Sequence, residues 1–441
     1  MPISPFPDAD NKRFSHFWQL GLETIRELET EQGILASSSQ EIYGCIFGRD
    51  SLITSLKLLR AYETARQPYF LGVVKKVLLT LAALQGKQVN IESGEEPGKC
   101  IHEFRTANYE HLVNHPTSPW FLYPDKIMRN YDSVDATPLL LITLYRYFQK
   151  SGDREFINSV LPNAEAALDW LLNNGDNNSD GFIDYRRHPE RKAGGLTTQN
   201  WMDSRESVFH ESGEEAVFPV APVEVQAYAY LALRLWSRFY RENNNPERAG
   251  ELKAKADNLK ILFNRKFVLS GPEGFSLATA LDGSGRPLAS VRSSMGHVLW
   301  ASLNEKDDSI RDGILDAGHV TLLVKRILAE DLFEPSAGIR TLSVKSKRFI
   351  ANSYHNGSIW PHDNSLIAEG LEIWGYGREA VAVRQAIFKA LSHFGTPIEL
   401  FVYKNGRYEE YCSPTGQKAC KKQAWSAASL LTASLSMQNF H

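Results

Sequence analysis

Two acidic residues in loops have the surroundings that acid–base chemistry requires. Asp203 follows Trp201 by two positions, and an indole nearby would partly desolvate the carboxyl group and favour the protonated form that a general acid needs. Glu399 stands between Ile398 and Leu400 in an apolar run, where an ionisable group is unusual unless it faces a pocket or has a partner. One acid and one base held apart by a scaffold are the minimum for splitting a glycosidic bond.

Each of these acids also has an ordinary interpretation. Asp203 has the sequence context of an aspartate that caps a helix or closes a loop, and Glu399 that of a glutamate on the solvated edge of a strand. Local sequence leaves both interpretations open.

Further polar residues open predicted helices. Arg49 offers a planar fork of N–H donors, and Asp50 offers two acceptor oxygens, a combination suited to adjacent sugar hydroxyls. The simpler interpretation is that Asp50 caps its helix. Asp132 and Asp135 precede an apolar helix, where Asp135 is a candidate N-cap, and Asp363 follows Pro361 in the same style. Viewed alone, these last aspartates are better explained as structural.

Residues 176–187 resemble the front half of a calcium-binding loop. The twelfth position is Arg187, where such a loop requires a bidentate glutamate. We therefore predict an Asx/Gly turn leading into a short strand at 182–185, and no metal site. The four cysteines, at 45, 100, 412 and 420, form no CxxC pair, so a zinc site is not predicted either.

Composition and motifs exclude several classes of function. The net charge is −3 with 23% charged residues, so we expect no nucleic-acid partner. The sequence contains no G-x-S-x-G elbow, phosphate loop, H-E-x-x-H or dinucleotide fingerprint. No window approaches the ~18 consecutive apolar residues of a membrane span. The start lacks the basic and apolar segments of a signal peptide, so we expect a cytoplasmic chain with reduced thiols.

The dominant periodicity is helical and predicts an all-α chain, because apolar residues recur at i, i+3, i+4 and i+7 in many segments. Twelve helices are expected, over residues 13–32, 50–62, 68–85, 134–150, 154–174, 222–242, 246–267, 294–304, 310–330, 362–375, 378–394 and 423–437.

The connections between these helices alternate in length. Links after even-numbered helices are short, and links after odd-numbered helices are mostly long, as in 86–133 and 175–221. Short links make antiparallel hairpins. Six hairpins closed into an (α/α)6 toroid would carry every long loop at one end, beside the starts of the even-numbered helices. A superhelical array of hairpins is the competing architecture. No linker divides the sequence, so residues 1–441 are predicted to be a single domain.

With these motifs in place, the chain resembles the amylo-α-1,6-glucosidase domain of glycogen debranching enzymes and, more distantly, the glucoamylase-like and trehalase-like glycosidases. The resemblance rests on the order of seven segments, which are 48–51, 131–136, 200–204, 221–228, 354–364, 399–401 and 423–425.

The resemblance implies an (α/α)6 barrel and an inverting, exo-acting hydrolase that releases glucose from an α-glucoside without a cofactor. It implies that Asp203 is the general acid and Glu399 the general base. It also implies a sugar-binding wall, which consists of Arg49, Asp50, Asp135, Trp201, His355, Asn356, Trp360, Gln423 and Trp425.

The substrate and some alternatives stay open. Full debranching enzymes carry a second activity or an extra N-terminal domain, whereas this sequence begins near its first predicted helix, so a small glucoside is expected rather than a branched polymer. Loop 86–133 has no function that the resemblance supplies. The alternatives are a disaccharide phosphorylase, lyase or epimerase on the same fold, and a carbohydrate-binding protein without activity. The sequence does not fix the oligomeric state.

Overall fold

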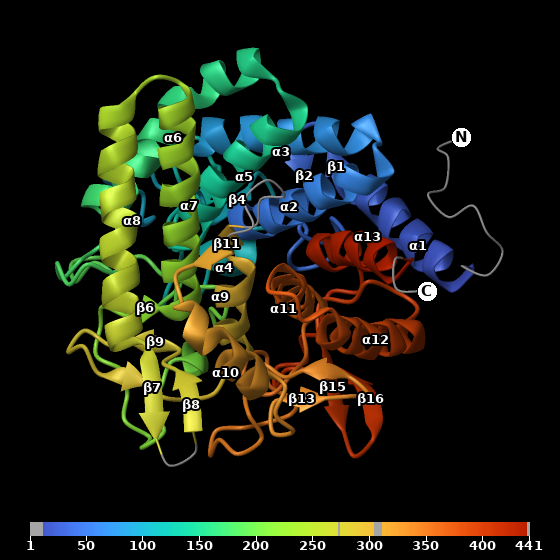
Figure 1. Ribbon diagram of the computed structural model, residues 1–441. Coiled ribbons are helices and arrows are strands. Elements are labelled where there is room, and N and C mark those ends of the chain that lie inside the picture. The colour runs from blue at the N-terminus through green and yellow to red at the C-terminus, as the bar shows by residue number, and fades with distance from the viewer. Residues whose placement is uncertain (1–11, 272–273, 304–310, 439–441) are drawn as a thin grey trace.

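Helices form two concentric rings in the computed structural model, which describes residues 12–271, 274–303 and 311–438 (Figure 1). The inner ring consists of α2 (Gly48–Ala65), α5 (Ala136–Ser151), α7 (Val223–Glu242), the single turn α9 (His297–Trp300), α11 (Pro361–Ile373) and α13 (Ala424–Gln438). The outer ring consists of α1 (Lys12–Leu28), α3 (Pro68–Leu84), α6 (Arg154–Asn173), α8 (Pro246–Lys266), α10 (Ala317–Ile327) and α12 (Gly377–Phe394).

The inner ring is closed. Each inner helix contacts the next, from α2 through α5, α7, α9 and α11 to α13, and α13 packs back against α2. The first helix, α1, packs on the last, α13, and so completes the sixth hairpin. Contact between the two ends of the chain is what a toroid requires and what an open superhelical array lacks. The predicted (α/α)6 fold is confirmed.

Burial distinguishes the two rings. Fifteen of the 20 residues of α7 are buried, because other helices and the barrel interior surround it, whereas only five of the 21 residues of α8 are buried along one stripe. The short links are made by local signals. Gly152 ends α5 in the left-handed conformation (φ +66°), and the Asp153 side chain then accepts the N–H of Phe156 to cap α6.

The long connections fold into small antiparallel sheets. A three-stranded sheet joins β3 (Ile46–Phe47), β4 (Glu103–Arg105) and β5 (Met128–Asn130), and Phe47 pairs with Glu103 across it. A second joins β6 (Ala221–Pro222), β9 (Ala280–Leu281) and β10 (Pro287–Leu288). The two-stranded sheets are β1 (Glu29–Thr30) with β2 (Gly33–Ile34), β7 (Val268–Gly271) with β8 (Gly274–Leu277), β11 (Ser302–Leu303) with β12 (Asp312–Gly313), β13 (Phe333–Glu334) with β14 (Gly338–Ile339), and β15 (Phe401–Lys404) with β16 (Arg407–Glu410). Short helical turns complete the loops, namely α4 (Glu110–Val113), η2 (Arg205–Ser207) and η3 (Ser293–Gly296).

Three predicted helices are wrong in extent. The helix predicted at 13–32 ends at Leu28, because the next residues enter the β1–β2 hairpin. The helix predicted at 294–304 is reduced to η3 and the one turn of α9, since Ser302 pairs with Gly313 in the β11–β12 sheet. The helix predicted at 310–330 is confined to α10, and the predicted link 304–309 lies outside the described residues.

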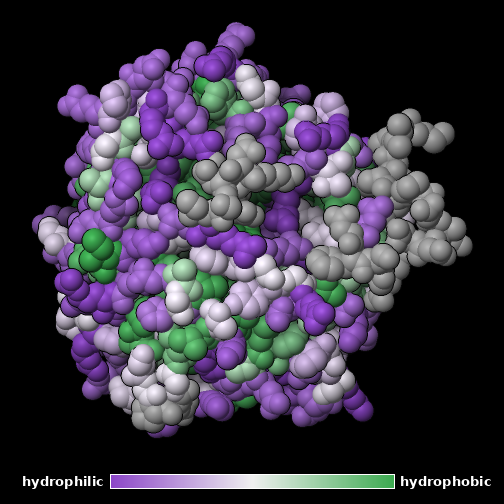
Figure 2. All heavy atoms as spheres, in the orientation of Figure 1, coloured by the Kyte–Doolittle hydropathy of each residue, from purple (hydrophilic) through white to green (hydrophobic). Residues whose placement is uncertain are grey.

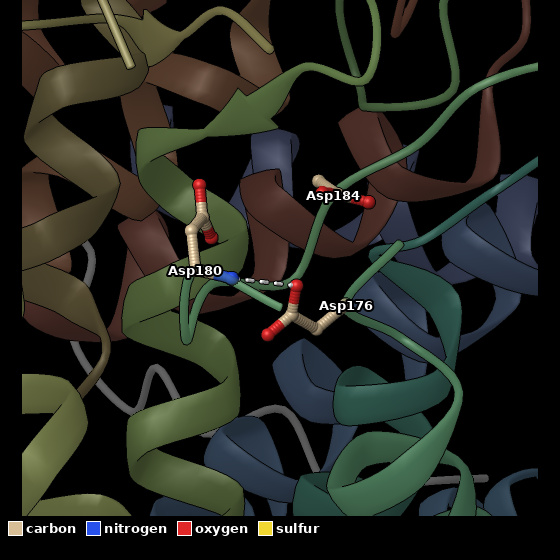
Figure 3. A group of neighbouring side chains, drawn as sticks. All are labelled: Asp176, Asp180 and Asp184. Carbon is tan, nitrogen blue, oxygen red and sulfur yellow. Dashed lines mark hydrogen bonds between the residues drawn. The ribbon is translucent and has the colours of Figure 1, made fainter. Parts of the chain in front are cut away.

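The predicted turn at residues 176–181 is confirmed, and the strand predicted after it is wrong. Asp176 accepts the backbone N–H of Asp180 at 3.2 Å (Figure 3). It also accepts the backbone N–H of Gly181 at 2.8 Å, and Gly181 has φ +94°. Only one β-bridge follows, between Tyr185 and Val220. One carboxylate oxygen from each of Asp176, Asp180 and Asp184 lies within 4.8 Å of the others. The carboxylate of Asp176 closes the turn by accepting these two N–H groups.

The surface in Figure 2 is mostly hydrophilic, with hydrophobic residues gathered in smaller groups, chiefly in the lower half of that view. The large exposed apolar side chains belong to different elements, such as Leu79 on α3, Ile261 on α8 and Leu322 on α10. Scattered apolar residues are normal on protein surfaces. Among the described residues, no helix combines the length and apolar character needed to cross a bilayer. All four cysteines are free thiols.

A buried ion pair ties two inner helices together across the ring. Lys57 on α2 lies 2.8 Å from Glu369 on α11 and donates to Ser365 at 2.9 Å, with side chains that are 1% and 4% exposed for Lys57 and Glu369. We expect Lys57→Met to lower the free energy of unfolding by about 3 kcal/mol, since it removes the closest cation to a buried carboxylate. Urea denaturation measures this.

The matched control is Lys75→Met. Lys75 pairs with Asp153 at 2.7 Å but is 42% exposed, so its loss should cost less than about 1 kcal/mol. Equal effects of the two substitutions would contradict the role given to the buried pair.

Candidate active site

A cavity of about 360 Å³ opens at the end of the toroid where the long loops emerge and the inner helices α2, α11 and α13 begin. Its floor and walls include most of the residues that the sequence motifs predicted. These are Arg49, Asp50, Trp201, Asp203, His355, Trp360, Glu399, Gln423 and Trp425.

Both candidate catalytic carboxyl groups line this cavity. Asp203 lies in the loop before η2, and its side chain is 24% exposed, so a ligand can reach it. Glu399 lies in the loop between α12 and β15 and is 2% exposed. The fold therefore brings together two acids that are almost 200 residues apart in the sequence.

Arg49 positions Asp203. Its Nη1 donates to Oδ2 of Asp203 at 3.1 Å, its Nε donates to Asp135 at 2.6 Å, and its Nη2 donates to the carbonyl of Asn200 at 3.0 Å. Ser133 donates to the other oxygen of Asp135 at 2.5 Å. The planar guanidinium thus fixes the start of α2, the start of α5 and the loop carrying Asp203 in one geometry.

Burial raises the pKa of Asp203 to about 6, against the lowering effect of the nearby Arg49 guanidinium. An ordinary aspartate is almost fully ionised at neutral pH. A carboxyl group with a pKa near 6 retains a protonated fraction there, which is the state that can donate a proton.

Glu399 is held from two sides. The hydroxyl of Tyr354 donates to Oε1, and the backbone N–H of Cys420 donates to Oε2 at 2.8 Å. Burial raises the pKa of Glu399 to about 7, while these two hydrogen bonds favour the ionised form and act in the opposite direction. The carboxyl group is therefore oriented and able to change its protonation state near neutral pH.

Several polar atoms on the cavity wall are buried, and no described atom of the protein accepts from or donates to them. They are Nε1 of Trp201, Nε2 of His355, Oε1 of Gln423 and Nε1 of Trp425. Unsatisfied buried polar groups are rare in proteins and cost stability unless a ligand or water pairs with them. Since all four residues line one cavity, these atoms can serve the hydroxyl groups of a polar ligand.

Asp50 provides an acceptor on the same wall. Gln423 donates to Oδ1 of Asp50 at 3.1 Å. Burial raises the pKa of Asp50 to about 7, Arg49 lowers it, and the charges of Asp203 and Glu399 raise it further. A helix-capping bond from the Asp50 side chain is not formed, and α2 begins after Phe47.

Packed aromatic rings hold the wall rigid. Trp201 is stacked on His297 (5.7 Å between centroids), and His297 lies between the hydroxyl of Tyr228 (2.6 Å) and Asp363 (2.7 Å). Trp425 is stacked on His362 at 3.7 Å, and His355 on Trp360 at 5.1 Å. These contacts leave the ring edges little freedom, which suits recognition of one orientation of a ligand.

Two residues predicted to bind substrate do not line the cavity. Asp135 is fully buried, and its carboxylate forms an ion pair with the guanidinium of Arg49. Asn356 accepts from Arg292 at 2.7 Å and donates to the carbonyl of Glu206 at 3.0 Å, so it braces the loop after Asp203. Both act through the residues that they hold in place.

One wall of the cavity was not predicted from the sequence. Loop 86–133 supplies His102, Glu103, Arg105, His111, Leu112, His115 and Trp120 to the cavity. The aromatic run that begins at Trp120 was the one local signal, because aromatic residues in a polar loop are unusual. Other contributors outside the predicted set are Ile42, Tyr43, Phe47, Leu196, Tyr354 and Gln417.

Comparison with known proteins decides the family. The model of the mannosylglycerate hydrolase MGH1-like glycoside hydrolase domain matches residues 102–426. The chain belongs to this glycoside hydrolase family. The predicted kinship with six-hairpin glycosidases is confirmed, whereas the narrower likeness to debranching enzymes stays a prediction. No curated protein matches the sequence.

Solved structures share the fold of this glycoside hydrolase at low identity. The GH63 mannosylglycerate hydrolase from Thermus thermophilus, in complex with Tris and D-glycerate, has a TM-score of 0.63 and 16% identity, over 94% of this chain and 99% of that one. A metal-independent alpha mannosidase from Streptococcus pneumoniae, in a non-productive complex with alpha-1,6-mannobiose, has a TM-score of 0.63 and 12% identity, over 98% and 95%.

The hydrogen bond from Tyr354 to Glu399 gives a test of the site's electrostatics. Because this bond lowers the pKa of Glu399, Tyr354→Phe should raise that pKa and reduce the ionised fraction at pH 6.5. We expect kcat/KM to fall by about tenfold or more, as one unit of pKa corresponds to a tenfold change.

The measurement is the pH dependence of kcat/KM, which should be bell-shaped in the unmodified enzyme with limbs near pH 6 and 7. The control is Tyr411→Phe, which removes the hydroxyl of a tyrosine whose ring packs on that of Tyr354 (5.4 Å between centroids). A Tyr354→Phe profile that superimposes on the control would show that the bond does not tune Glu399.

Proposed function

We propose that this glycoside hydrolase is an inverting, exo-acting α-glycosidase in which Asp203 is the general acid and Glu399 the general base. One observation carries the proposal. The carboxyl groups of Asp203 and Glu399, both with raised pKa values, line a single cavity, whose wall also presents buried, unpaired polar atoms and aromatic rings. A pyranose can stack one face on the aromatic rings of such a wall and pair its hydroxyl groups with the polar atoms.

The contacts of each carboxyl group suit its proposed role. Oδ2 of Asp203 accepts from Arg49, so the transferable proton belongs on Oδ1, from which it passes to the glycosidic oxygen. Each oxygen of Glu399 accepts a hydrogen bond, from Tyr354 or from the backbone of Cys420, and the carboxylate offers a further lone pair to the attacking water. Inversion requires about 6.5–9.5 Å between the two carboxyl groups, which leaves room for that water. No metal or organic cofactor enters this mechanism.

A small glycoside is the proposed substrate. A cavity of about 360 Å³ is near the lower end of the ~300–1,000 Å³ range of small-molecule sites, which favours one hexose and a short leaving group over a branched polymer. Since α1 and α13 close the ring, we propose that the chain acts as one catalytic domain.

Two hexoses are candidates for the released sugar. The resemblance to debranching enzymes favours glucose, which is our first candidate. The family description and the structural neighbours, a mannosylglycerate hydrolase and an alpha mannosidase, favour mannose. A phosphorylase is less well supported, because both arginines that line the cavity already pair with carboxylates.

Substitution of each acid tests the assignment of roles. We expect Asp203→Asn and Glu399→Gln each to reduce kcat on an unactivated glycoside by about 10²–10⁴-fold, since that is the usual contribution of a general acid or base. Fluoride leaves without protonation, so a glycosyl fluoride should restore turnover to Asp203→Asn and not to Glu399→Gln. Steady-state hydrolysis of both substrates measures this.

Asp125→Asn is the control, since Asp125 lies in a surface loop, where its carboxylate pairs with Arg129 and accepts the backbone N–H of Ile127. Its activity should be unchanged. Full activity of Asp203→Asn on an unactivated glycoside would remove Asp203 from the mechanism.

A further inference from the structure

The wall that loop 86–133 contributes runs from buried residues, Glu103 and Arg105, out to exposed ones at the mouth of the cavity. His111 and His115 are exposed and Trp120 is half-buried, whereas Trp201, Gln423 and Trp425 are buried. An exo-acting enzyme holds the terminal sugar at the closed end of its pocket. The leaving group therefore faces the loop 86–133 wall, and the charges on this wall select it.

Carboxyl groups outnumber cations around the cavity. Four carboxyl groups line it, from Asp50, Glu103, Asp203 and Glu399, against two guanidinium groups, from Arg49 and Arg105. Burial and neighbouring cations lower the pKa values of His102 and His355 well below their usual range, so these two imidazoles are neutral. The pKa of His111 is also lowered, chiefly by partial desolvation and then by the charge of Arg105.

Both guanidinium groups already donate from all three of their nitrogens. Arg49 uses all three of its nitrogens on Asp135, Asp203 and the carbonyl of Asn200. Arg105, the one guanidinium group that loop 86–133 contributes to the cavity lining, donates its Nε to Glu103, its Nη1 to the carbonyl of Asn108 at 3.2 Å and its Nη2 to the carbonyl of Ile42 at 2.7 Å.

The fold keeps Glu103 and Arg105 together. Both belong to β4, both are 3% exposed, and the pairing of Glu103 with Phe47 and with Asn130 fixes the strand from both sides. Arg205 on η2 is exposed and does not line the cavity. The positive charge of Arg105 is therefore already paired with Glu103 and is not available to an anionic leaving group.

We propose that the leaving group of this enzyme is an uncharged polyhydroxyl group, a sugar or a polyol, and that Glu103 excludes carboxylate-bearing leaving groups by neutralising Arg105. This inference rests on the proposed function and refines it. Like charges brought together in a desolvated site are strongly unfavourable, and sites built for hydroxyl groups discriminate by large factors. Sugar and polyol hydroxyls can instead pair with the imidazoles of this wall and with Gln417.

The test uses two substrates that differ by one group. One substrate is α-glucosylglycerate, and the other is α-glucosylglycerol, in which a hydroxymethyl group takes the place of the carboxylate. The two corresponding mannosides cover the second candidate sugar. We expect kcat/KM for hexose release to be at least about 100-fold higher for the neutral member of the responsive pair. Equal rates, or a preference for the carboxylate, would overturn the inference while leaving the proposed hydrolysis intact. Release from neither member, with maltose and isomaltose also inert, would contradict the proposed function, and the inference would fall with it.

A variant assigns the effect to Glu103. Glu103→Gln preserves the size of the side chain and leaves Arg105 without its carboxylate, so we expect the rate ratio of carboxylate to neutral substrate to rise by about tenfold. Glu110→Gln removes the same charge from the exposed start of α4 and should leave the ratio unchanged. A ratio that stays constant in both variants would remove Glu103 as the determinant. The substrate ratio of the unmodified enzyme tests the proposal even where a variant does not fold.

Discussion

The guanidinium of Arg49 is the interaction on which the rest of the site depends. It joins the first turn of α2 to Asp135 at the entrance of α5 and to the loop that carries Asp203. All three segments come from different hairpins of the toroid. A buried cation with two carboxylate partners is stable only while every partner is present, because each one left alone would keep an uncompensated charge in a desolvated place. The position of the candidate acid is therefore coupled to the closure of the ring.

Several inner helices of the toroid carry an acidic residue in their first turn. These helices begin at the functional end: Asp50 on α2 lines the cavity, Glu224 on α7 accepts from Asn200, and Asp363 on α11 pairs with His297. Helix N-termini stabilise negative charge, whereas burial destabilises it. Burial is the larger effect for Asp50 and Glu224, whose pKa values are each raised to about 7. An end of the barrel with raised carboxyl pKa values is suited to proton transfer near neutral pH.

Much of this arrangement could be predicted from sequence, because helical periodicity is local and long loops are visible as gaps in it. The alternation of short and long links implied that Arg49, Trp201, Asp203, His355, Glu399 and Trp425 would gather at one end, and they do. Their roles in catalysis and binding stay predictions. Local sequence did not reveal in which direction each side chain points. Asp135 and Asn356 occur in the right segments, yet their side chains face Arg49 and Arg292 instead of the cavity.

The wall formed by loop 86–133 was unpredictable for another reason. It depends on pairing between β3 and β4, where Phe47 meets Glu103, and such long-range pairing leaves no periodic signal in a segment of three residues. The helix predicted at 294–304 was wrong for a similar reason, because Ser302 pairs with Gly313 of β12. Contacts of this kind override local propensity. They also created the charge pattern from which we infer the leaving group.

The stereochemistry of the first product tests the central claim most directly. Proton NMR during early hydrolysis of an α-glycoside (the glucosides and mannosides of glycerol, with maltose and isomaltose) identifies the anomer released before it mutarotates. Inversion by Asp203 and Glu399 predicts that the β-hexose appears first. Initial release of the α-hexose would show retention, which requires a nucleophile about 5 Å from the acid, and would contradict the assignment of Glu399 as the base.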